Sequence, residues 1–146
     1  MMLILPDLAA TERLAARLAA LVSPGDAILL SGPLGAGKTA FARAFLRAAA
    51  ADPALEVPSP SFTLVQTYDT ARGTVHHFDL WRLDGPGALT ELGWEDAREA
   101  IVLVEWPDRL GLLAPPDALR LSFTLGEGEA RLVEVEGWLD RLAPEA

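Results

Sequence analysis

A chain of 146 residues is long enough to bury a hydrophobic core without disulfide or metal cross-links, and we expect one domain spanning residues 1–146. The absence of cysteine excludes a disulfide framework and a thiolate zinc site, and it is typical of a cytoplasmic protein. With 21 acidic against 12 basic residues, the chain is a poor candidate for direct binding of a long nucleic acid, and the lack of an apolar run of about 18 residues predicts no membrane span.

The N-terminal third alternates helical and strand patterns. The predicted elements, in chain order, are a helix over Leu8–Leu21 with Thr11 as its cap, a buried strand over Ala27–Leu30, a glycine-rich loop over Gly32–Gly37 and a helix over Thr39–Ala50. The strand is apolar throughout, which is typical of a strand covered on both faces.

The middle and the end of the chain differ in pattern. Three prolines between Asp52 and Ser61 predict an irregular loop. The elements predicted after it are strands over Phe62–Tyr68 and Thr74–Leu80, one or two short helices over Ala88–Ala100 hinged near Gly93, a strand over Ile101–Val104 that ends in Glu105, a hairpin of Leu119–Leu125 with Ala130–Val135, and a terminal helix over Trp138–Leu142. This order predicts an α/β fold in three layers, with a mainly parallel sheet between helices and antiparallel additions such as the C-terminal hairpin.

The glycine-rich loop carries the complete Walker A pattern of a phosphate-binding loop (P-loop), Gly32-Pro33-Leu34-Gly35-Ala36-Gly37-Lys38-Thr39. Backbone N–H groups of such a loop cradle phosphate, and the positive end of the following helix points at it. We therefore predict a P-loop NTPase fold in which Lys38 reaches the β- and γ-phosphates and the Thr39 hydroxyl ligates Mg²⁺. The residues of this segment predicted to bind the nucleotide are Pro33, Leu34, Gly35, Ala36, Gly37, Lys38, Thr39 and Ala40.

The only lysine of the chain is Lys38, beside eleven arginines. A compact ammonium fits a tight phosphate cradle, whereas a guanidinium is a broad planar fork, so this choice supports a phosphate-binding role. Many GTPases recognise guanine with an Asn-Lys-x-Asp motif, which this chain cannot contain because it has no second lysine. We therefore predict ATP with Mg²⁺ as the ligand.

A P-loop site also needs an acidic residue at the end of a strand to hold Mg²⁺ or its waters. Two candidates follow apolar strands, Asp79 and Glu105. We predict that both are metal ligands and that both are catalytic together with Lys38. The alternative for each is a solvated carboxylate at a strand end.

Several other residues are candidates for the same site. The hydroxyl of Ser61 lies in a Pro-Ser segment that either approaches the γ-phosphate or is simply a rigid loop. Trp106 directly follows Glu105 and either lines the site or belongs to the core. His76 and His77 are neighbours on a strand and therefore face opposite ways, so they cannot both enter the site; the sequence does not assign roles to His77, Trp81 and Arg82.

Four segments together resemble the TsaE (YjeE) family, the small ATPases of bacterial tRNA threonylcarbamoyladenosine biosynthesis. The matching segments, from roughly Thr11 to Leu110, are Gly32 to Thr39, Ser59-Pro60-Ser61-Phe62-Thr63-Leu64, His77-Phe78-Asp79-Leu80-Trp81-Arg82-Leu83 and Glu105-Trp106-Pro107. Four motifs in the family's order are far more specific than a P-loop alone. The chain departs from the family pattern at Pro33, where an acidic or polar residue is usual, at Ser61 in place of threonine, and at Trp81 in place of tyrosine.

The resemblance implies a function in tRNA modification. Lys38 would bind phosphate, Thr39 and Glu105 would serve Mg²⁺, Asp79 would take the Walker B-like position, and Ser61 would lie in a switch-like loop. The partners would be the proteins TsaB and TsaD, which transfer threonylcarbamoyl onto adenosine 37 of tRNAs that read codons starting with A. ATP hydrolysis would reset that machinery between cycles, and tRNA would be contacted only through the partners.

Two other functions remain open from the sequence. A small-molecule kinase could use the same P-loop, but it normally needs an Arg-rich lid, and no Arg-rich stretch follows the sheet. A non-hydrolysing binding module would use ATP only to order the loop at Ser59–Ser61. Release of free phosphate in the presence of partners distinguishes both from an ATPase.

Overall fold

The computed structural model describes residues 1–58, 63–83 and 86–142. Seven strands form one sheet in the order β1-β7-β6-β2-β5-β4-β3. The strands are β1 (Met2–Leu5), β2 (Ala27–Ser31), β3 (Val65–Thr70), β4 (Gly73–Asp79), β5 (Ile101–Glu105), β6 (Leu119–Leu125) and β7 (Arg131–Glu136). The helices are α1 (Leu8–Ala19), α2 (Lys38–Ala50), α3 (Trp94–Ala97) and α4 (Leu139–Leu142), with 3₁₀ segments η1 (Pro86–Leu92) and η2 (Pro107–Leu113).

The centre of the sheet is parallel and its edges are antiparallel. Strands β6, β2, β5 and β4 run parallel to one another. Strand β7 pairs antiparallel with β6, β1 with β7, and β3 with β4. The predicted α/β class and the C-terminal hairpin are confirmed. A parallel centre requires crossover segments that cover both faces, which explains why β5 is buried along its whole length and β2 is buried up to Leu30.

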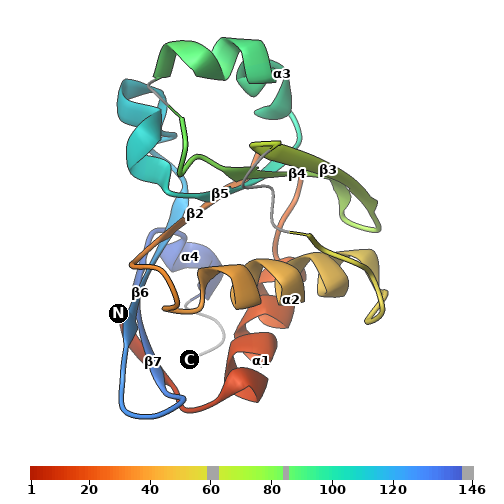
Figure 1. Ribbon diagram of the computed structural model, residues 1–146. Helices are drawn as coiled ribbons and strands as arrows, with labels where there is room; N and C mark the ends of the chain where they lie inside the picture. The colour runs from red at the N-terminus through yellow and green to blue at the C-terminus, as the bar shows by residue number, and fades with distance from the viewer. Residues whose placement is uncertain (59–62, 84–85, 143–146) are drawn as a thin grey trace.

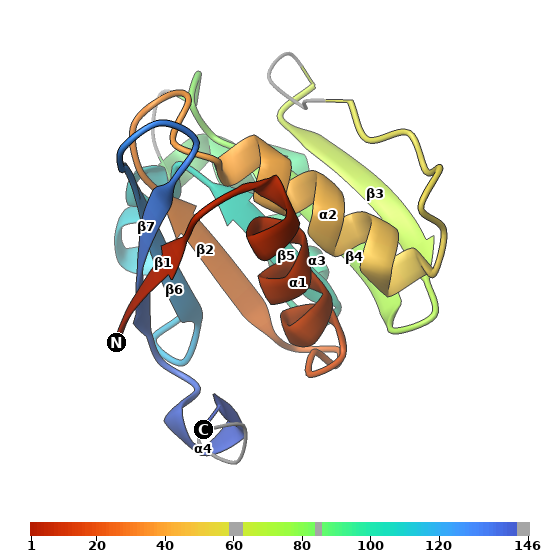
Figure 2. The same cartoon turned by 90° about the horizontal axis from the view of Figure 1, so that it is seen from below.

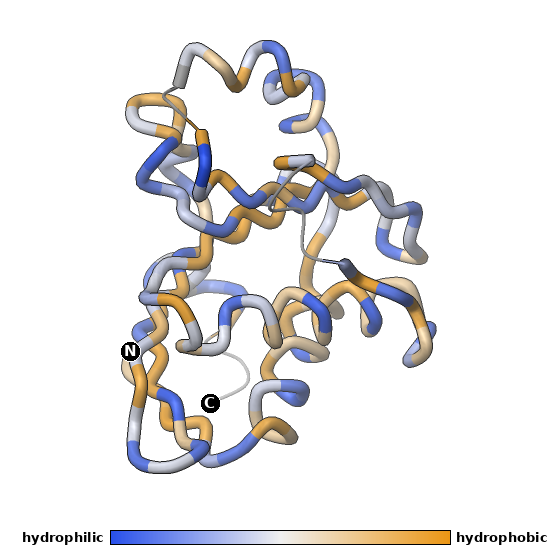
Figure 3. The backbone as a smooth tube through the Cα atoms, viewed as in Figure 1, coloured by the Kyte–Doolittle hydropathy of each residue, from blue (hydrophilic) through white to orange (hydrophobic). Residues whose placement is uncertain are grey.

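Helices lie on both faces of the sheet, as Figure 1 shows. Helices α1 and α2 cover one face and cross it side by side in Figure 2, while η1 and α3 cover the other. The buried face of α2 includes Phe41, Phe45 and Leu46, which repeat at helical spacing. In Figure 3, the tube is coloured as hydrophobic along much of the central strands of the sheet. Burial of each such large side chain stabilises the fold by roughly 1.5–3 kcal/mol before entropy is counted.

Two predicted boundaries need correction, and one predicted hinge is confirmed. Thr11 does not cap α1, because the helix begins a turn earlier and the Asp7 carboxylate accepts from the Ala10 N–H at 2.9 Å. The strand predicted over Phe62–Tyr68 begins only at Val65, since Leu64 has a left-handed backbone (φ 68°). The predicted hinge at Gly93 is confirmed, with a left-handed conformation between η1 and α3.

Two elements were not predicted. Strand β1 pairs with β7 from the other end of the chain, with Met2 opposite Glu134, and a four-residue apolar run alone does not indicate such a partner. The segment η2 follows Trp106, whose backbone is left-handed at φ 61°. Among the described residues, no helix has both the length and the apolar character needed to cross a membrane.

Candidate functional site

The P-loop joins the carboxyl end of β2 to the first turn of α2. Its path depends on Gly32, which has a φ of 137° and whose added Cβ would collide with the Phe123 carbonyl oxygen of β6. Gly37, with a φ of 112°, turns the chain into α2 at Lys38. The loop is thereby held at the carboxyl edge of the parallel strands, where ligands bind in open α/β sheets.

Lys38 is buried at the start of α2, with only 4% of its surface exposed. Its ammonium donates a hydrogen bond to the Gly32 carbonyl and lies 3.5 Å from the centroid of the Trp106 ring. Burial lowers the pKa of the Lys38 amine, and the nearby carboxylates of Glu105 and Asp79 oppose that shift. The loop therefore folds around a cation that has carboxylates within electrostatic range.

The two predicted acidic residues lie side by side. Parallel pairing of β4 with β5 sets Asp79 opposite Glu105 at the carboxyl edge. The Thr39 hydroxyl donates to Glu105 Oε1 at 3.3 Å, and Asp79 Oδ1 accepts from the Trp81 N–H at 3.1 Å. Both carboxylates are buried, so neither is the solvated strand-end group that the sequence left as an alternative.

His77 is part of this cluster. Its Nε2 lies 2.7 Å from Glu105 Oε2, and the side chain is 1% exposed. His76 faces the other way, as strand alternation predicts, and its Nδ1 lies 3.0 Å from the Thr67 hydroxyl. The two residues thus differ in surroundings, and the only sequence signal that separates them is that His77, not His76, begins one of the four family-like segments.

A cavity of about 430 Å³ opens at this edge of the sheet. It is lined by Leu34, Gly35, Gly37, Lys38, Thr39, Ala40, Asp79, Glu105, Trp106 and Arg131. Of the described residues predicted for the site, only Pro33 and Ala36 do not line this cavity. The Ala36 side chain is fully buried, and its N–H donates to the Pro33 carbonyl. Ser61 lies outside the described residues.

Arg131 was not predicted from the sequence. It comes from β7, more than ninety residues after the P-loop, and no motif marks it. A second cavity of about 250 Å³ shares Arg131, Gly37 and Ala40 with the first and extends to Asp7 and Leu8 at the start of α1. The site therefore continues past the P-loop toward α1 and the β6–β7 turn.

Two tryptophan rings pack against each other at a tilt of 47° beside the cavity. The ring centroids of Trp81 and Trp106 are 4.4 Å apart, and Trp106 contacts Lys38 from within the cavity. Trp81 remains 42% exposed. Trp106 therefore lines the cavity, and Trp81 packs against it from the solvent side.

The donor set fits Mg²⁺ that arrives with a nucleotide. Within residues 1–58, 63–83 and 86–142, no group of three or more His, Cys, Asp or Glu side chains could hold a metal ion. The cavity offers one hydroxyl, Thr39, and two carboxylates, Asp79 and Glu105. Mg²⁺ typically keeps several waters and binds one or two carboxylates together with substrate phosphates, which matches this set.

Two comparisons of sequence agree on one family, and a comparison of structure agrees on the fold. The family model described as threonylcarbamoyl adenosine biosynthesis protein TsaE matches residues 5–133. The tRNA threonylcarbamoyladenosine biosynthesis protein TsaE of Rickettsia felis is 36% identical over 135 residues, which is 92% of this chain and 78% of the relative. Its namesake in Aquifex aeolicus is 38% identical over 99 residues, covering 68% of this chain and 71% of the relative. The crystal structure of YdiB from Bacillus subtilis superposes with a TM-score of 0.78 at 23% identity, covering 99% of this chain and 92% of that one, and shows likeness of fold.

Proposed function

This chain belongs to the TsaE family of threonylcarbamoyl adenosine biosynthesis proteins, and from that premise we propose that it is an ATPase that binds ATP with Mg²⁺. The observation that carries the proposal is the convergence of Lys38, Thr39 and Glu105 on one cavity. A cation, a hydroxyl and a carboxylate at the end of a parallel strand are the groups that phosphoryl-transfer sites of this class use.

Each residue has a distinct role in the proposal. The backbone N–H groups from Leu34 to Ala40 and the positive end of α2 bind the phosphates. Lys38 neutralises the β- and γ-phosphates, while Thr39 and the carboxylates of Asp79 and Glu105 hold Mg²⁺ directly or through water. The bound ion offsets the charge that builds up on the phosphates during cleavage. Water then attacks the γ-phosphorus, and the products are ADP and phosphate.

The second cavity gives room for the rest of the nucleotide. We assign the ribose and the base to the region where the two cavities meet, because Gly37, Ala40 and Arg131 line both. The Arg131 guanidinium donates hydrogen bonds to the carbonyls of Gly128 and Ala130, which hold it in the β6–β7 turn beside both cavities. Adenine is favoured over guanine because the chain has no Asn-Lys-x-Asp motif.

The biological role follows from the family. In the proposal, the protein acts in the cytoplasm with TsaB and TsaD, and its hydrolysis resets their transfer of threonylcarbamoyl to adenosine 37 of tRNA between cycles. A formal net charge of −9 suits a protein partner better than direct contact with tRNA. The whole chain would work as one ATPase domain.

The test is release of free phosphate from ATP by the purified protein, alone and with TsaB and TsaD. We expect slow release alone and faster release with the partners, and loss of both when Lys38 is changed to Ala. ADP without free phosphate in the presence of an acceptor would indicate a kinase instead. ATP binding without phosphate release under any condition would indicate a non-hydrolysing module and would overturn the ATPase assignment.

A further inference from the structure

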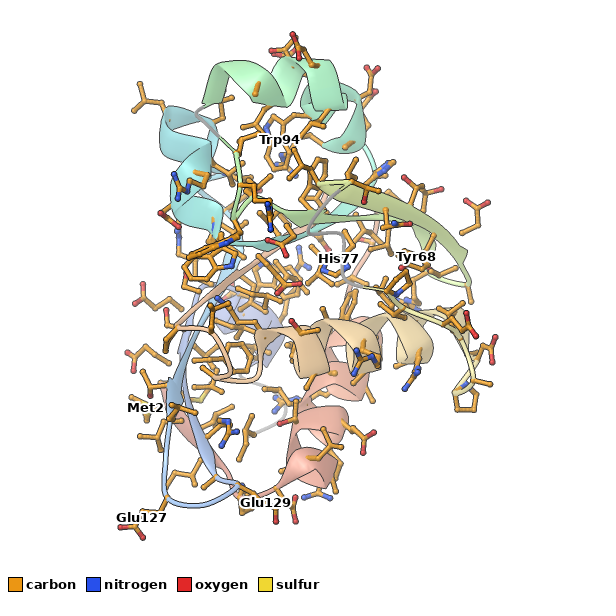
Figure 4. The ribbon with its side chains drawn as sticks, viewed as in Figure 1. Met2, Tyr68, His77, Trp94, Glu127 and Glu129 are labelled. Atoms are coloured by element: carbon orange, nitrogen blue, oxygen red, sulfur yellow. The ribbon has the colours of Figure 1, made fainter. Side chains whose placement is uncertain are left out.

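His77 is a buried polar residue to which the proposed chemistry assigns no role. It lies on β4 two residues before Asp79, so both side chains project from the same face of the strand. Figure 4 shows His77 between the sheet and α2, the helix that follows the P-loop. Its place is therefore directly behind the edge where the carboxylates line the cavity.

The contact of His77 with Glu105 has a defined direction. A carboxylate only accepts hydrogen bonds, so His77 Nε2 carries the proton and donates to Glu105 Oε2 across 2.7 Å. The other oxygen, Oε1, accepts from the Thr39 hydroxyl at 3.3 Å. The two oxygens of one carboxylate are thus held from opposite sides, by the strand behind it and by the P-loop helix in front of it.

This arrangement controls rotation of the carboxylate. The last torsion of a glutamate side chain has a broad, roughly two-fold preference, so packing alone does not fix the plane of the oxygens. Thr39 cannot fix it during the reaction, because its hydroxyl is proposed to bind Mg²⁺. His77 is then the donor that holds Oε2 inward and leaves Oε1 facing the cavity.

A role in packing alone does not account for the histidine. Val75, two residues earlier on the same face of β4, is fully buried and fills its space with an apolar side chain. At His77, by contrast, Nδ1 has no hydrogen-bond partner within the described residues. A buried polar atom left without a partner is unfavourable, by about 1–3 kcal/mol in typical cases. The bond from Nε2 to Glu105 is the interaction that an apolar residue could not supply.

We propose that His77 is a positioning residue that orients the Glu105 carboxylate for Mg²⁺ delivered with the nucleotide. The proposal rests on the proposed function, since it assumes a nucleotide-linked ion at Thr39 and Glu105. Outer-shell partners of metal ligands typically change metal affinity by about 10- to 100-fold when they are removed. His77 therefore acts on the ion through Glu105 and does not itself touch the ion or the nucleotide.

The experiment uses calorimetry to measure ATP binding at a series of Mg²⁺ concentrations. Two further measurements are the ATP affinity in EDTA and the melting temperature of the apo protein. In His77→Leu we expect the Mg²⁺ midpoint, which is the Mg²⁺ concentration that gives half of the full increase in ATP affinity, to rise by about 10-fold or more. The ATP affinity in EDTA should be unchanged. His77→Gln places an amide donor near the position of Nε2 and should retain most of the wild-type response. His76→Gln changes the neighbouring histidine, which faces away from Glu105, and is the matched control.

A double variant separates positioning from packing. In a Glu105→Gln background, His77→Leu should cause little further change in the Mg²⁺ response, because residues that act through one group are not additive. The proposal would be overturned if wild type and His77→Leu had equal Mg²⁺ midpoints. It would also be overturned if His77→Leu raised the midpoint in the Glu105→Gln background by as much as it does in wild type. If His77→Leu does not fold, His77→Asn replaces it, because the shorter amide of Asn does not reach Glu105. Equal Mg²⁺ midpoints for His77→Asn and His77→Gln would then overturn the proposal. If wild-type protein binds ATP without any response to Mg²⁺, the proposed function fails instead.

Discussion

The ammonium of Lys38 lies 3.5 Å from the centroid of the Trp106 ring, inside a cavity that also contains the carboxylates of Asp79 and Glu105. Lys38 therefore has an aromatic face on one side and the Gly32 carbonyl on another. These two contacts define the position of the Lys38 ammonium at the edge of the cavity.

Replacement of Lys38 should abolish tight ATP binding. A hydrogen bond to a charged group contributes roughly 1.5–3 kcal/mol, so Lys38→Ala should lose about 10- to 100-fold in ATP affinity. Lys38→Arg should also fail, because a broad planar guanidinium does not replace a compact ammonium in a tight phosphate cradle. Calorimetric titration with Mg²⁺·ATP measures both. Near-normal affinity in either variant would contradict the assignment of this loop.

Removal of either carboxylate charge should impair turnover and leave the fold intact. In Glu105→Gln, the amide oxygen can still accept from His77 and the amide nitrogen can donate to Thr39, so the buried contacts persist. In Asp79→Asn, the amide oxygen can still accept from the Trp81 N–H. We expect phosphate release with TsaB and TsaD to fall by about 10²–10³-fold in each, as when one preorganised electrostatic group is lost.

The readouts for this pair are the Mg²⁺ dependence of ATPase activity and the thermal melt of each apo protein. Glu99→Gln is the matched control, because Glu99 is exposed just before β5, at the opposite end of the strand from Glu105. A variant that melts like wild type and keeps its Mg²⁺ requirement and rate would show that its carboxylate has no part in the chemistry.

ATP should stabilise the protein more than GTP. A ligand present at 100 times its Kd stabilises the folded state by about 2.7 kcal/mol, which for a domain of this size raises the melting temperature by several degrees. The missing Asn-Lys-x-Asp motif predicts a much smaller shift with Mg²⁺·GTP at the same concentration. Thermal melts with each nucleotide measure the difference, and an equal or larger shift with GTP would refute the choice of ATP.

The Asp26–Arg141 pair should make stability depend on acidic pH. Arg141 of α4 donates two hydrogen bonds to the Asp26 carboxylate, at 2.7 and 2.8 Å. Burial raises the pKa of Asp26, but the hydrogen bonds from Arg141 and Ser23 outweigh it and hold that pKa below its ordinary value of 3.8. A lowered carboxyl pKa contributes stability above the ordinary value, and that stability is lost as the pH falls through the lowered pKa.

Arg141→Gln should therefore lower the free energy of unfolding by about 0.5–1 kcal/mol at neutral pH, because Arg141 is 39% exposed and water screens the pair. The difference from wild type should shrink as the pH falls below 3.8. Urea unfolding at a series of pH values measures it, with Arg120→Gln on the exposed face of β6 as control. A difference that persists unchanged in acid would exclude this carboxylate as its source.

The local patterns of the chain were sufficient for much of the fold. The Walker A spacing, the apolar strand before it and the helix after it depend on neighbouring residues, and β2 and α2 lie within a residue of the predicted bounds. Strand β5 likewise ends at Glu105 as predicted. The start of β3 was misplaced because the left-handed turn at Leu64 has no sequence signal such as glycine.

What the sequence by itself determined is the phosphate-binding loop, the strand ends with their acidic residues, and the resemblance to one family, because each is encoded within a short segment. Only the tertiary structure decided which distant side chains meet. The register of β4 on β5 sets Asp79 opposite Glu105 and brings His77 to its carboxylate, and the β6–β7 hairpin carries Arg131 to the loop. These contacts depend on strand pairing between segments far apart in the chain, and a one-residue slip in register would turn each side chain to the other face of the sheet.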